Sequence, residues 1–165
     1  MEKYSAREVI EQAIRTEKLG YEFYTTMAKK FRKDFALKDL FELLASKELR
    51  HEKIFSKLKT KVENEEPEGW EDVAQYLRAI VESEFFLGKG KSLPSLRNVK
   101  TIGDAVEFAI GFEKETMLYF YVIKDVIKEK DIVENIIEEE KTHIVWLSEF
   151  RTELKKKQIQ RGSSK

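Results

Sequence analysis

Cysteine is absent from the sequence, and proline, glycine and histidine are scarce, with two, seven and two residues among 165. Without thiols the chain offers no disulfide, no zinc site with cysteine ligands, no iron–sulfur cluster and no iron site held by four cysteines. Few residues that break regular structure, together with 38% charged and 41% hydrophobic residues, are typical of long helices. The length suits one domain that buries a core of its own.

An excess of charge of either sign is also missing, because the formal net charge is zero. This balance does not favour nucleic acid or an anionic membrane as a partner. No apolar run reaches the length of a membrane span, and residues 1–5 lack the apolar core of a signal peptide. We therefore expect a cytoplasmic protein with no membrane partner. The abundance of Glu and Lys is typical of a thermophilic source.

Amphipathic periodicity predicts four long helices. Their ranges are about 5–31, 36–63, 101–127 and 131–155. The first helix begins with a capping box formed by Ser5 and Glu8. The third begins at Thr101, whose side chain caps the helix and is followed by the early acidic residue Asp104.

The connections between these helices predict their arrangement. Short turns follow the first and third helices, so each helix forms an antiparallel hairpin with the next one. The connection over residues 64–101 holds both prolines and is long enough to cross from one end of a bundle to the other. The sequence therefore predicts an all-α four-helix bundle of residues 1–158, made of two antiparallel hairpins joined by a long crossover. A flexible polar tail, residues 159–165, follows the bundle.

A short helix is expected inside the crossover, over residues 70–87. Its apolar side, which we expect to cover the bundle or a second subunit, comprises Val73, Leu77, Ile80 and Val81. Glu82 and Glu84 could offer a supplementary ligand to a site in the bundle, but a solvated face is the simpler interpretation of both.

Each of the four long helices has an apolar stripe that ionisable residues interrupt near its middle. The stripe of the first helix comprises Ile10, Ala13, Glu17, Tyr21, Tyr24, Ala28 and Phe31. The second and fourth helices carry a Glu-x-x-His unit, in which the two side chains share one helix face. The six interrupting residues are Glu17, Glu48, His51, Glu113, Glu140 and His143.

The two halves of the chain repeat this pattern. Glu17 and Glu113 lie 96 positions apart, and each follows an Ala-Ile pair and precedes a pair of aromatic residues. The two Glu-x-x-His units, which end at His51 and His143, lie 92 positions apart. Each predicted hairpin therefore carries one lone Glu and then one Glu-x-x-His unit, which indicates pseudo-twofold symmetry.

Four interruptions in the middle of four helices predict one shared site. Four buried carboxylates without a cation would repel one another, and their pKa values would rise until most were protonated. Two divalent metal ions would balance the four negative charges, and two neutral imidazoles would add none. Carboxylate-rich ligation with one His for each ion suits iron or manganese better than zinc. This set of residues on four helices is that of di-metal carboxylate bundles.

Taken one at a time, the same residues have simpler interpretations. A Glu-x-x-His pair commonly lies on a helix surface, and a lone Glu in a stripe commonly reaches solvent. Aromatic residues near the site are most simply core packing. They are Tyr21, Tyr24, Tyr119, Phe120 and Tyr121.

On the pattern of the six residues, the chain resembles the ferritin-like superfamily of di-iron carboxylate proteins and, within it, the rubrerythrin family, over about residues 5–157. The resemblance implies a catalytic centre of two iron ions, with manganese or zinc as alternatives. It implies that Glu17 and Glu113 are ligands from single helices and that Glu48 and Glu140 bridge the ions. The two histidines, His51 and His143, would serve one ion each.

Two features depart from the family pattern. The family usually has a second Glu three residues after the Glu113 position, where this chain has Thr116. That Glu takes part in a redox-linked metal shift, so this step is not expected here. A rubredoxin domain, common in the family, is not part of this sequence, so electrons would come from a separate rubredoxin-like donor. The resemblance also implies a homodimer.

Three functional hypotheses follow. The leading one is a di-iron oxidoreductase that reduces hydrogen peroxide or dioxygen, as the resemblance implies. The second is a non-enzymatic iron-binding or ferroxidase-type iron-handling protein, whose ferritin-like storage role would need a multi-subunit shell. The third is a structural or interaction bundle with a metal-free polar network, which would keep its thermal stability in a chelator.

Overall fold

The structure, a computed structural model, describes residues 5–62, 69–83 and 98–163, without the side chains of residues 81–83 and 126. Within these ranges the chain forms five helices and no strand, which confirms the all-α prediction. The helices are α1 (Ala6–Lys30), α2 (Phe35–Lys61), α3 (Trp70–Ser83), α4 (Ile102–Val126) and α5 (Lys130–Gly162).

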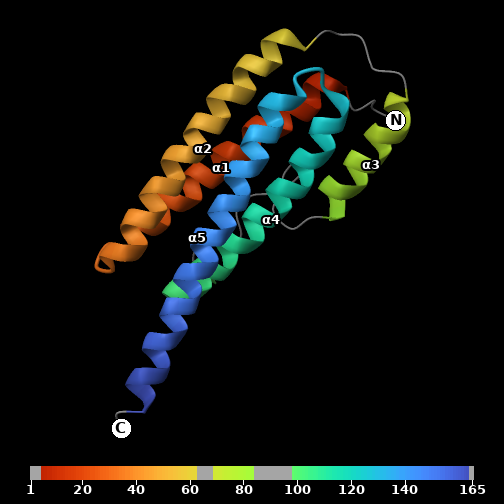
Figure 1. The fold of residues 1–165 in the computed structure, drawn as a ribbon. Coiled ribbons are helices and arrows are strands. Elements are labelled where there is room, and N and C mark those ends of the chain that lie inside the picture. The colour runs from red at the N-terminus through yellow and green to blue at the C-terminus, as the bar shows by residue number, and fades with distance from the viewer. Residues whose placement is uncertain (1–4, 63–68, 84–97, 164–165) are drawn as a thin grey trace.

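Two antiparallel hairpins make up the bundle (Figure 1). Helix α1 packs along α2, and α4 packs along α5, as the short turns between them predict. Contacts of α1 with α4 and of α2 with α5 join the two hairpins. Helix α3 lies beside α4 on the outside of the bundle, so the four long helices alone enclose its centre.

Capping boxes begin α1 and α4. The Ser5 hydroxyl accepts a hydrogen bond from the Glu8 N–H at 3.2 Å, and the Glu8 carboxylate accepts one from the Ser5 N–H at 2.8 Å. Thr101 and Asp104 make the same reciprocal pair, at 3.0 Å and 2.8 Å. Both predicted starts are confirmed, and the two boxes fix the equivalent ends of the two hairpins.

Helix α2 begins one residue earlier than the periodicity predicts, because Asp34 acts as its cap. The Asp34 carboxylate accepts a hydrogen bond from the Leu37 N–H at 3.0 Å, and the Asp34 N–H donates to the Phe31 carbonyl at 2.9 Å. This tight turn lets α2 return directly along α1.

A polar layer divides the core into two apolar clusters. One cluster lies toward the α1 N-terminus and includes Phe55 and Phe120, while the other includes Phe23 and Phe41. On each long helix the residues change from one cluster to the other on passing the interrupting Glu or Glu-x-x-His unit. Each large buried apolar side chain contributes about 1.5–3 kcal/mol to folding, so the clusters can support a costly polar layer between them.

Helix α3 covers the bundle with its apolar side. Of the two predicted partners for that side, the bundle or a second subunit, the structure shows the bundle. Trp70 and Leu77 are buried in the first cluster, and Ile80 is buried as well. The side chains of residues 81 and 82 and all of residue 84 lie outside the described residues. The possible supplementary ligands, Glu82 and Glu84, therefore lie there as well.

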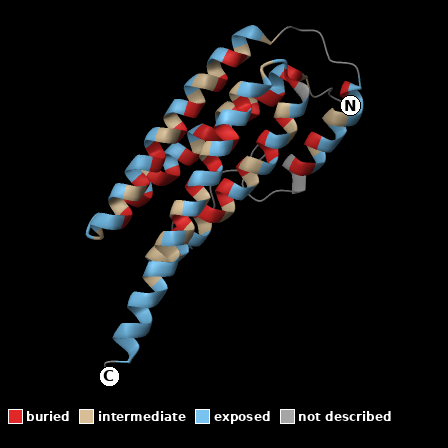
Figure 2. Cartoon of the chain, viewed as in Figure 1, coloured by how far each residue is buried: buried red, intermediate tan, exposed pale blue. Residues whose placement is uncertain are grey.

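Helix α5 runs on to Gly162, whereas the apolar periodicity predicts its end near residue 155. Residues 155–163 are exposed, and Figure 2 shows this segment extending past the other helices as an exposed rod. Good helix formers such as Lys and Gln continue the helix without any apolar partner. The division into a bundle of residues 1–158 and a tail of residues 159–165 stays a prediction.

Candidate metal centre

The fold brings all six interrupting residues together in the polar layer. Each is buried, with an exposed fraction of 0% or 1%. Helix α1 contributes Glu17, α2 contributes Glu48 and His51, α4 contributes Glu113, and α5 contributes Glu140 and His143. Burying this many ionisable side chains is costly unless a partner compensates them.

The six residues form two overlapping groups. In each group, four ligand atoms lie within 4.8 Å of one another. The groups are Glu17, Glu48, His51 and Glu140, and Glu48, Glu113, Glu140 and His143. Glu48 and Glu140 belong to both groups, which is the placement that bridging carboxylates between two ions need.

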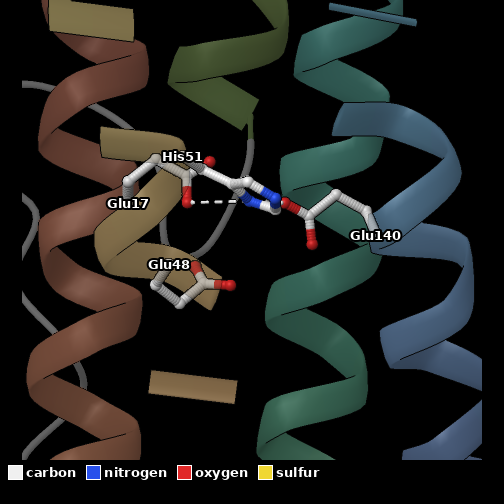
Figure 3. A group of neighbouring side chains, drawn as sticks. All are labelled: Glu17, Glu48, His51 and Glu140. Carbon is white, nitrogen blue, oxygen red and sulfur yellow. Dashed lines mark ion pairs between the residues drawn. The ribbon is translucent and has the colours of Figure 1, made fainter. Parts of the chain in front are cut away.

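In the first group, His51 lies at the centre (Figure 3). Its Nδ1 is 3.0 Å from Glu140 Oε1 and 3.5 Å from Glu17 Oε2. Figure 3 shows these side chains converging from α1, α2 and α5 into the space between the helices. One cation there would contact ligands from three helices at once.

In the second group, His143 takes the equivalent place. Its Nδ1 is 2.8 Å from Glu140 Oε2, 3.6 Å from Glu113 Oε1 and 3.7 Å from Glu48 Oε1. The imidazole rings of His51 and His143 lie nearly parallel, with centroids 5.8 Å apart. The pseudo-twofold symmetry of the sequence is therefore present in the geometry of the layer.

The donor atoms fit a pair of metal ions. Twelve buried side-chain nitrogen and oxygen atoms of the described residues make no hydrogen bond of suitable geometry, and eleven of them belong to the six residues. These include both Nδ1 atoms, whose contacts with Glu140 are close but not aligned as hydrogen bonds. Native proteins leave few buried polar atoms without a partner, so such a cluster needs an explanation. Oxygen and imidazole donors in this number suit iron or manganese.

The pKa values of the buried carboxyl groups also favour a bound cation. Burial, and then repulsion by the other carboxylates, raises the pKa of Glu17 and of Glu48 well above the usual value. The same two causes raise the pKa of Glu113 to about 7. Without a cation, the layer must therefore hold protons that a divalent ion would displace.

The pKa values of Glu140 and His143 are shifted in the directions expected of an ion pair, lowered for the carboxyl group and raised for the imidazole. Burial alone would raise the pKa of Glu140, but the two imidazoles of His143 and His51 hold it well below its usual range. Burial lowers the pKa of His143, but contacts with Glu113 and Glu140 outweigh this effect and raise it to about 10. The lowered pKa favours the ionised form of Glu140 in the metal-free layer.

Glycine at position 20 makes room for one bridging carboxylate. A Cβ added at Gly20 would collide with Glu48 Oε2 and lie 2.9 Å from the Phe112 ring. The Glu48 carboxylate therefore lies directly against the backbone of α1. Sequence periodicity did not single out this glycine, because its role depends on a residue of another helix.

Tyr24 has a role that the sequence pattern does not predict. Its hydroxyl donates a hydrogen bond to Glu113 Oε1, and the side chain is fully buried. Tyr119 and Phe120 are core residues, as expected, but Tyr21 and Tyr121 are 38% and 37% exposed, so core packing is the wrong interpretation for them. Helical spacing alone did not separate Tyr24 from Tyr21, since both lie in the apolar stripe of the first helix.

A seventh acidic residue, Glu139, was also missed. Its Oε2 lies 3.4 Å from His51 Nε2, on the side of the imidazole that faces away from the group. Arg50 and Lys47 pair with the same carboxylate and hold it in place. A carboxylate behind a ligating imidazole orients the ring and raises its basicity.

No helix in the described part of the chain is both long and apolar enough to span a membrane.

Comparisons with known proteins agree with the fold and with the family resemblance. A sequence profile of the rubrerythrin family matches residues 8–91, which hold Glu17, Glu48 and His51. No curated protein matches the sequence. A crystal structure from Thermotoga maritima, described as that of a ferritin-like diiron-carboxylate protein, is similar in fold. It shares 23% identity with a TM-score of 0.69, over 93% of this chain and 98% of that one.

The similarity in fold covers both hairpins, and the family profile covers half of the sequence, including the first hairpin. This protein has a ferritin-like fold and belongs to the rubrerythrin family.

Proposed function

We propose that this protein is a di-iron oxidoreductase of rubrerythrin type, which reduces hydrogen peroxide or dioxygen with electrons from a separate donor. The observation that carries this proposal is the pair of overlapping buried groups, with two carboxylates common to both. Membership of the rubrerythrin family supports the choice of oxidant and of iron.

Each side chain has a distinct task in this proposal. Glu17 and Glu113 would hold one ion each, Glu48 and Glu140 belong to both groups and would serve both ions, and the two histidines face the groups with Nδ1. A pair of iron ions held there supplies one-electron exchange between Fe²⁺ and Fe³⁺ to an oxidant. The two apolar clusters on either side exclude bulk water from the layer.

Reduction of hydrogen peroxide to two water molecules consumes two electrons and two protons. Tyr24 holds one proton at Glu113 Oε1 through its buried hydroxyl. A positioned proton donor of this kind assists a reaction in which an oxygen–oxygen bond breaks and both oxygens gain protons.

The electrons come from another protein in this proposal. The sequence has no cysteine, so it does not itself supply an iron site with four cysteine ligands. A small rubredoxin-like protein is the donor that family membership suggests, and a homodimer is the assembly that it suggests.

The test is rapid mixing of the anaerobic, reduced protein, loaded with about two Fe²⁺ per chain, with hydrogen peroxide or with dioxygen. We expect oxidation by peroxide to be at least about tenfold faster than that of free Fe²⁺ in the same buffer. Glu17→Gln and Glu113→Gln should each lose about one ion per chain, while Glu107→Gln, an exposed change on α4, should keep both. Oxidation no faster than that of free Fe²⁺ contradicts the proposal.

The same preparation separates the alternatives. Uptake of far more than two iron ions per chain by a large multi-subunit shell would favour iron storage. Absence of metal after anaerobic reconstitution, with unchanged thermal stability in a chelator, would favour a metal-free polar network.

A further inference from the structure

Among the residues that the structure describes, Thr116 is the one buried polar residue of the layer that lies outside the ligand set and has no partner for its side chain. It lies one helical turn after Glu113 on α4, and its exposed fraction is 0%. Its Oγ1 makes no hydrogen bond to any residue in the described ranges. Burying a hydroxyl in this way costs free energy unless something else accepts its proton.

Threonines on other helices of the bundle show what Thr116 does not do. The hydroxyl of Thr16, also fully buried, donates to the Gln12 carbonyl one turn earlier at 2.9 Å. Thr142 and Thr152 make the same bond to Glu138 and Ser148. Such a bond to the preceding turn is the usual solution for a threonine within a helix. Thr116 leaves it unmade, so its hydroxyl is free for a partner inside the bundle.

The pseudo-twofold symmetry identifies the residue of the first hairpin that is equivalent to Thr116. Glu17 and Glu113 are equivalent, so Gly20 on α1 is the equivalent of Thr116 on α4. At Gly20, the Glu48 carboxylate fills the space that a side chain would need. At Thr116, a side chain with a hydroxyl stands instead. The two halves therefore differ at this position: on α1 the Glu48 carboxylate takes the place of a side chain, and on α4 the equivalent residue carries a hydroxyl.

We propose that the Thr116 hydroxyl forms a subsite for a small oxygen-containing or pseudohalide ligand, such as hydrogen peroxide, hydroxide or azide, beside Glu113. The hydroxyl donates a hydrogen bond to the terminal atom of that ligand. The ligand must be small, because the residues on either side of Thr116 along the buried face, Phe112 and Tyr119, are fully buried. This inference rests on the proposed function only for the presence of bound iron.

Azide binding to the oxidised, iron-loaded protein tests the subsite, because azide gives a charge-transfer absorption band when it binds ferric iron. We expect Thr116→Val, which keeps the shape and removes the hydroxyl, to weaken azide binding about fivefold to tenfold, the loss of one hydrogen bond. Thr116→Ser should bind azide within about twofold of the unchanged protein. Thr16→Val, an equally buried change next to Glu17, is the matched control and should leave azide affinity unaltered.

A second measurement needs no metal and no activity. In the metal-free protein, Thr116→Val should raise or leave unchanged the midpoint of thermal unfolding, because it removes a buried hydroxyl without a partner. Thr16→Val should lower the midpoint, because it removes a hydroxyl that is hydrogen-bonded. A lower midpoint for Thr116→Val would show that its hydroxyl already has a partner, and would overturn the proposal.

The outcomes separate this inference from the proposed function. Weaker azide binding by Thr116→Val in a protein that peroxide does not oxidise would support the subsite and contradict the proposed oxidoreductase. Equal azide binding by Thr116→Val and the unchanged protein, where peroxide does oxidise the iron, would overturn the subsite alone. A protein that takes up no metal would overturn both.

Discussion

His51 Nε2 lies 3.4 Å from Glu139 Oε2, so the imidazole that faces the first group with Nδ1 has a carboxylate behind it. His143 differs, because all its close contacts with carboxylates of the described residues are made by Nδ1. Its ring lies against Trp146, with centroids 5.9 Å apart. The two groups contain the same types of ligand residue, but the histidines lie in different surroundings. We therefore expect two ions of unequal affinity.

Replacing Glu139 tests this inequality. Glu139→Gln removes the negative charge behind His51. It should weaken binding of the ion in the His51 group, which we expect to be the tighter of the two, about tenfold to a hundredfold. This is the range for a lost carboxylate behind a ligating histidine. Competition with a coloured chelator measures the affinity of each ion. Glu138→Gln, a neighbouring exposed change, should alter neither affinity. Equal effects of both substitutions would contradict the positioning role of Glu139.

Gly20→Ala should damage the layer although alanine favours helices. Such a change in an ordinary helix interior stabilises by about 1 kcal/mol. At Gly20 the added Cβ collides with the Glu48 carboxylate, so we expect a net loss of about 1–3 kcal/mol in the free energy of unfolding and weaker binding of both ions. Denaturant unfolding and metal titration measure the two effects.

The control for this change is Gly103→Ala, where the added Cβ would meet only Thr101 Oγ1, at an ordinary 3.6 Å. Its free energy of unfolding should be unchanged or slightly higher. If Gly20→Ala behaves in the same way, Glu48 does not depend on the space at Gly20.

Tyr24→Phe removes the hydroxyl that donates to Glu113 and leaves a buried carboxylate oxygen without its donor. We expect a loss of about 1–3 kcal/mol in the free energy of unfolding of the metal-free protein. Thermal or denaturant unfolding measures this, with Tyr76→Phe as the control, since the Tyr76 side chain is 56% exposed. An equal and small effect of both changes would mean that the hydrogen bond adds nothing to stability.

The metal-free protein should lose stability as the pH rises from about 4.5 to about 7. The pKa of Glu113 rises from 4.5 to about 7 on folding, so in this window the folded state binds more protons than the unfolded state. The free energy of unfolding therefore falls with rising pH, and the raised pKa of His143 continues the fall up to about 10. The lowered pKa of Glu140 acts in the opposite sense, but only below pH 4.5.

Urea unfolding of the metal-free protein at several pH values from about 5 to about 7 checks this slope. Glu113→Gln cannot lose a proton there and should show a shallower slope than the unchanged protein. Added metal should stabilise the protein more at the higher pH, because fewer protons then compete for the ligands. A metal-free protein whose stability rises over this window would contradict the raised pKa of Glu113.

The residues that the sequence predicted are those whose signal is local. Glu48 and His51 stand one turn apart on one helix, and the apolar stripe around them marks the face on which they lie. Repetition of the same pattern in the second hairpin then indicated that the four interruptions meet. The helices and their caps followed from equally local patterns.

The residues that the sequence did not predict depend on partners far along the chain. Tyr24 meets Glu113 across 89 positions, and nothing in the helical spacing distinguishes it from Tyr21, which faces outward. Glu139 lies beside a ligand, but its own role needs His51 of another hairpin. Which side chains meet across helices depends on the packing of the bundle, and periodicity does not specify it.

Neither hairpin can complete one site by itself. The first hairpin supplies Glu17, Glu48 and His51 to one group, and the fourth member, Glu140, comes from the second hairpin. In the second group the roles are reversed, with Glu48 supplied by the first hairpin. Each ion would thus cross-link the two halves of the chain without any covalent bond. Two hairpins from different copies of the chain would form the same pair of sites, so the ligand arrangement is compatible with exchange of hairpins between subunits.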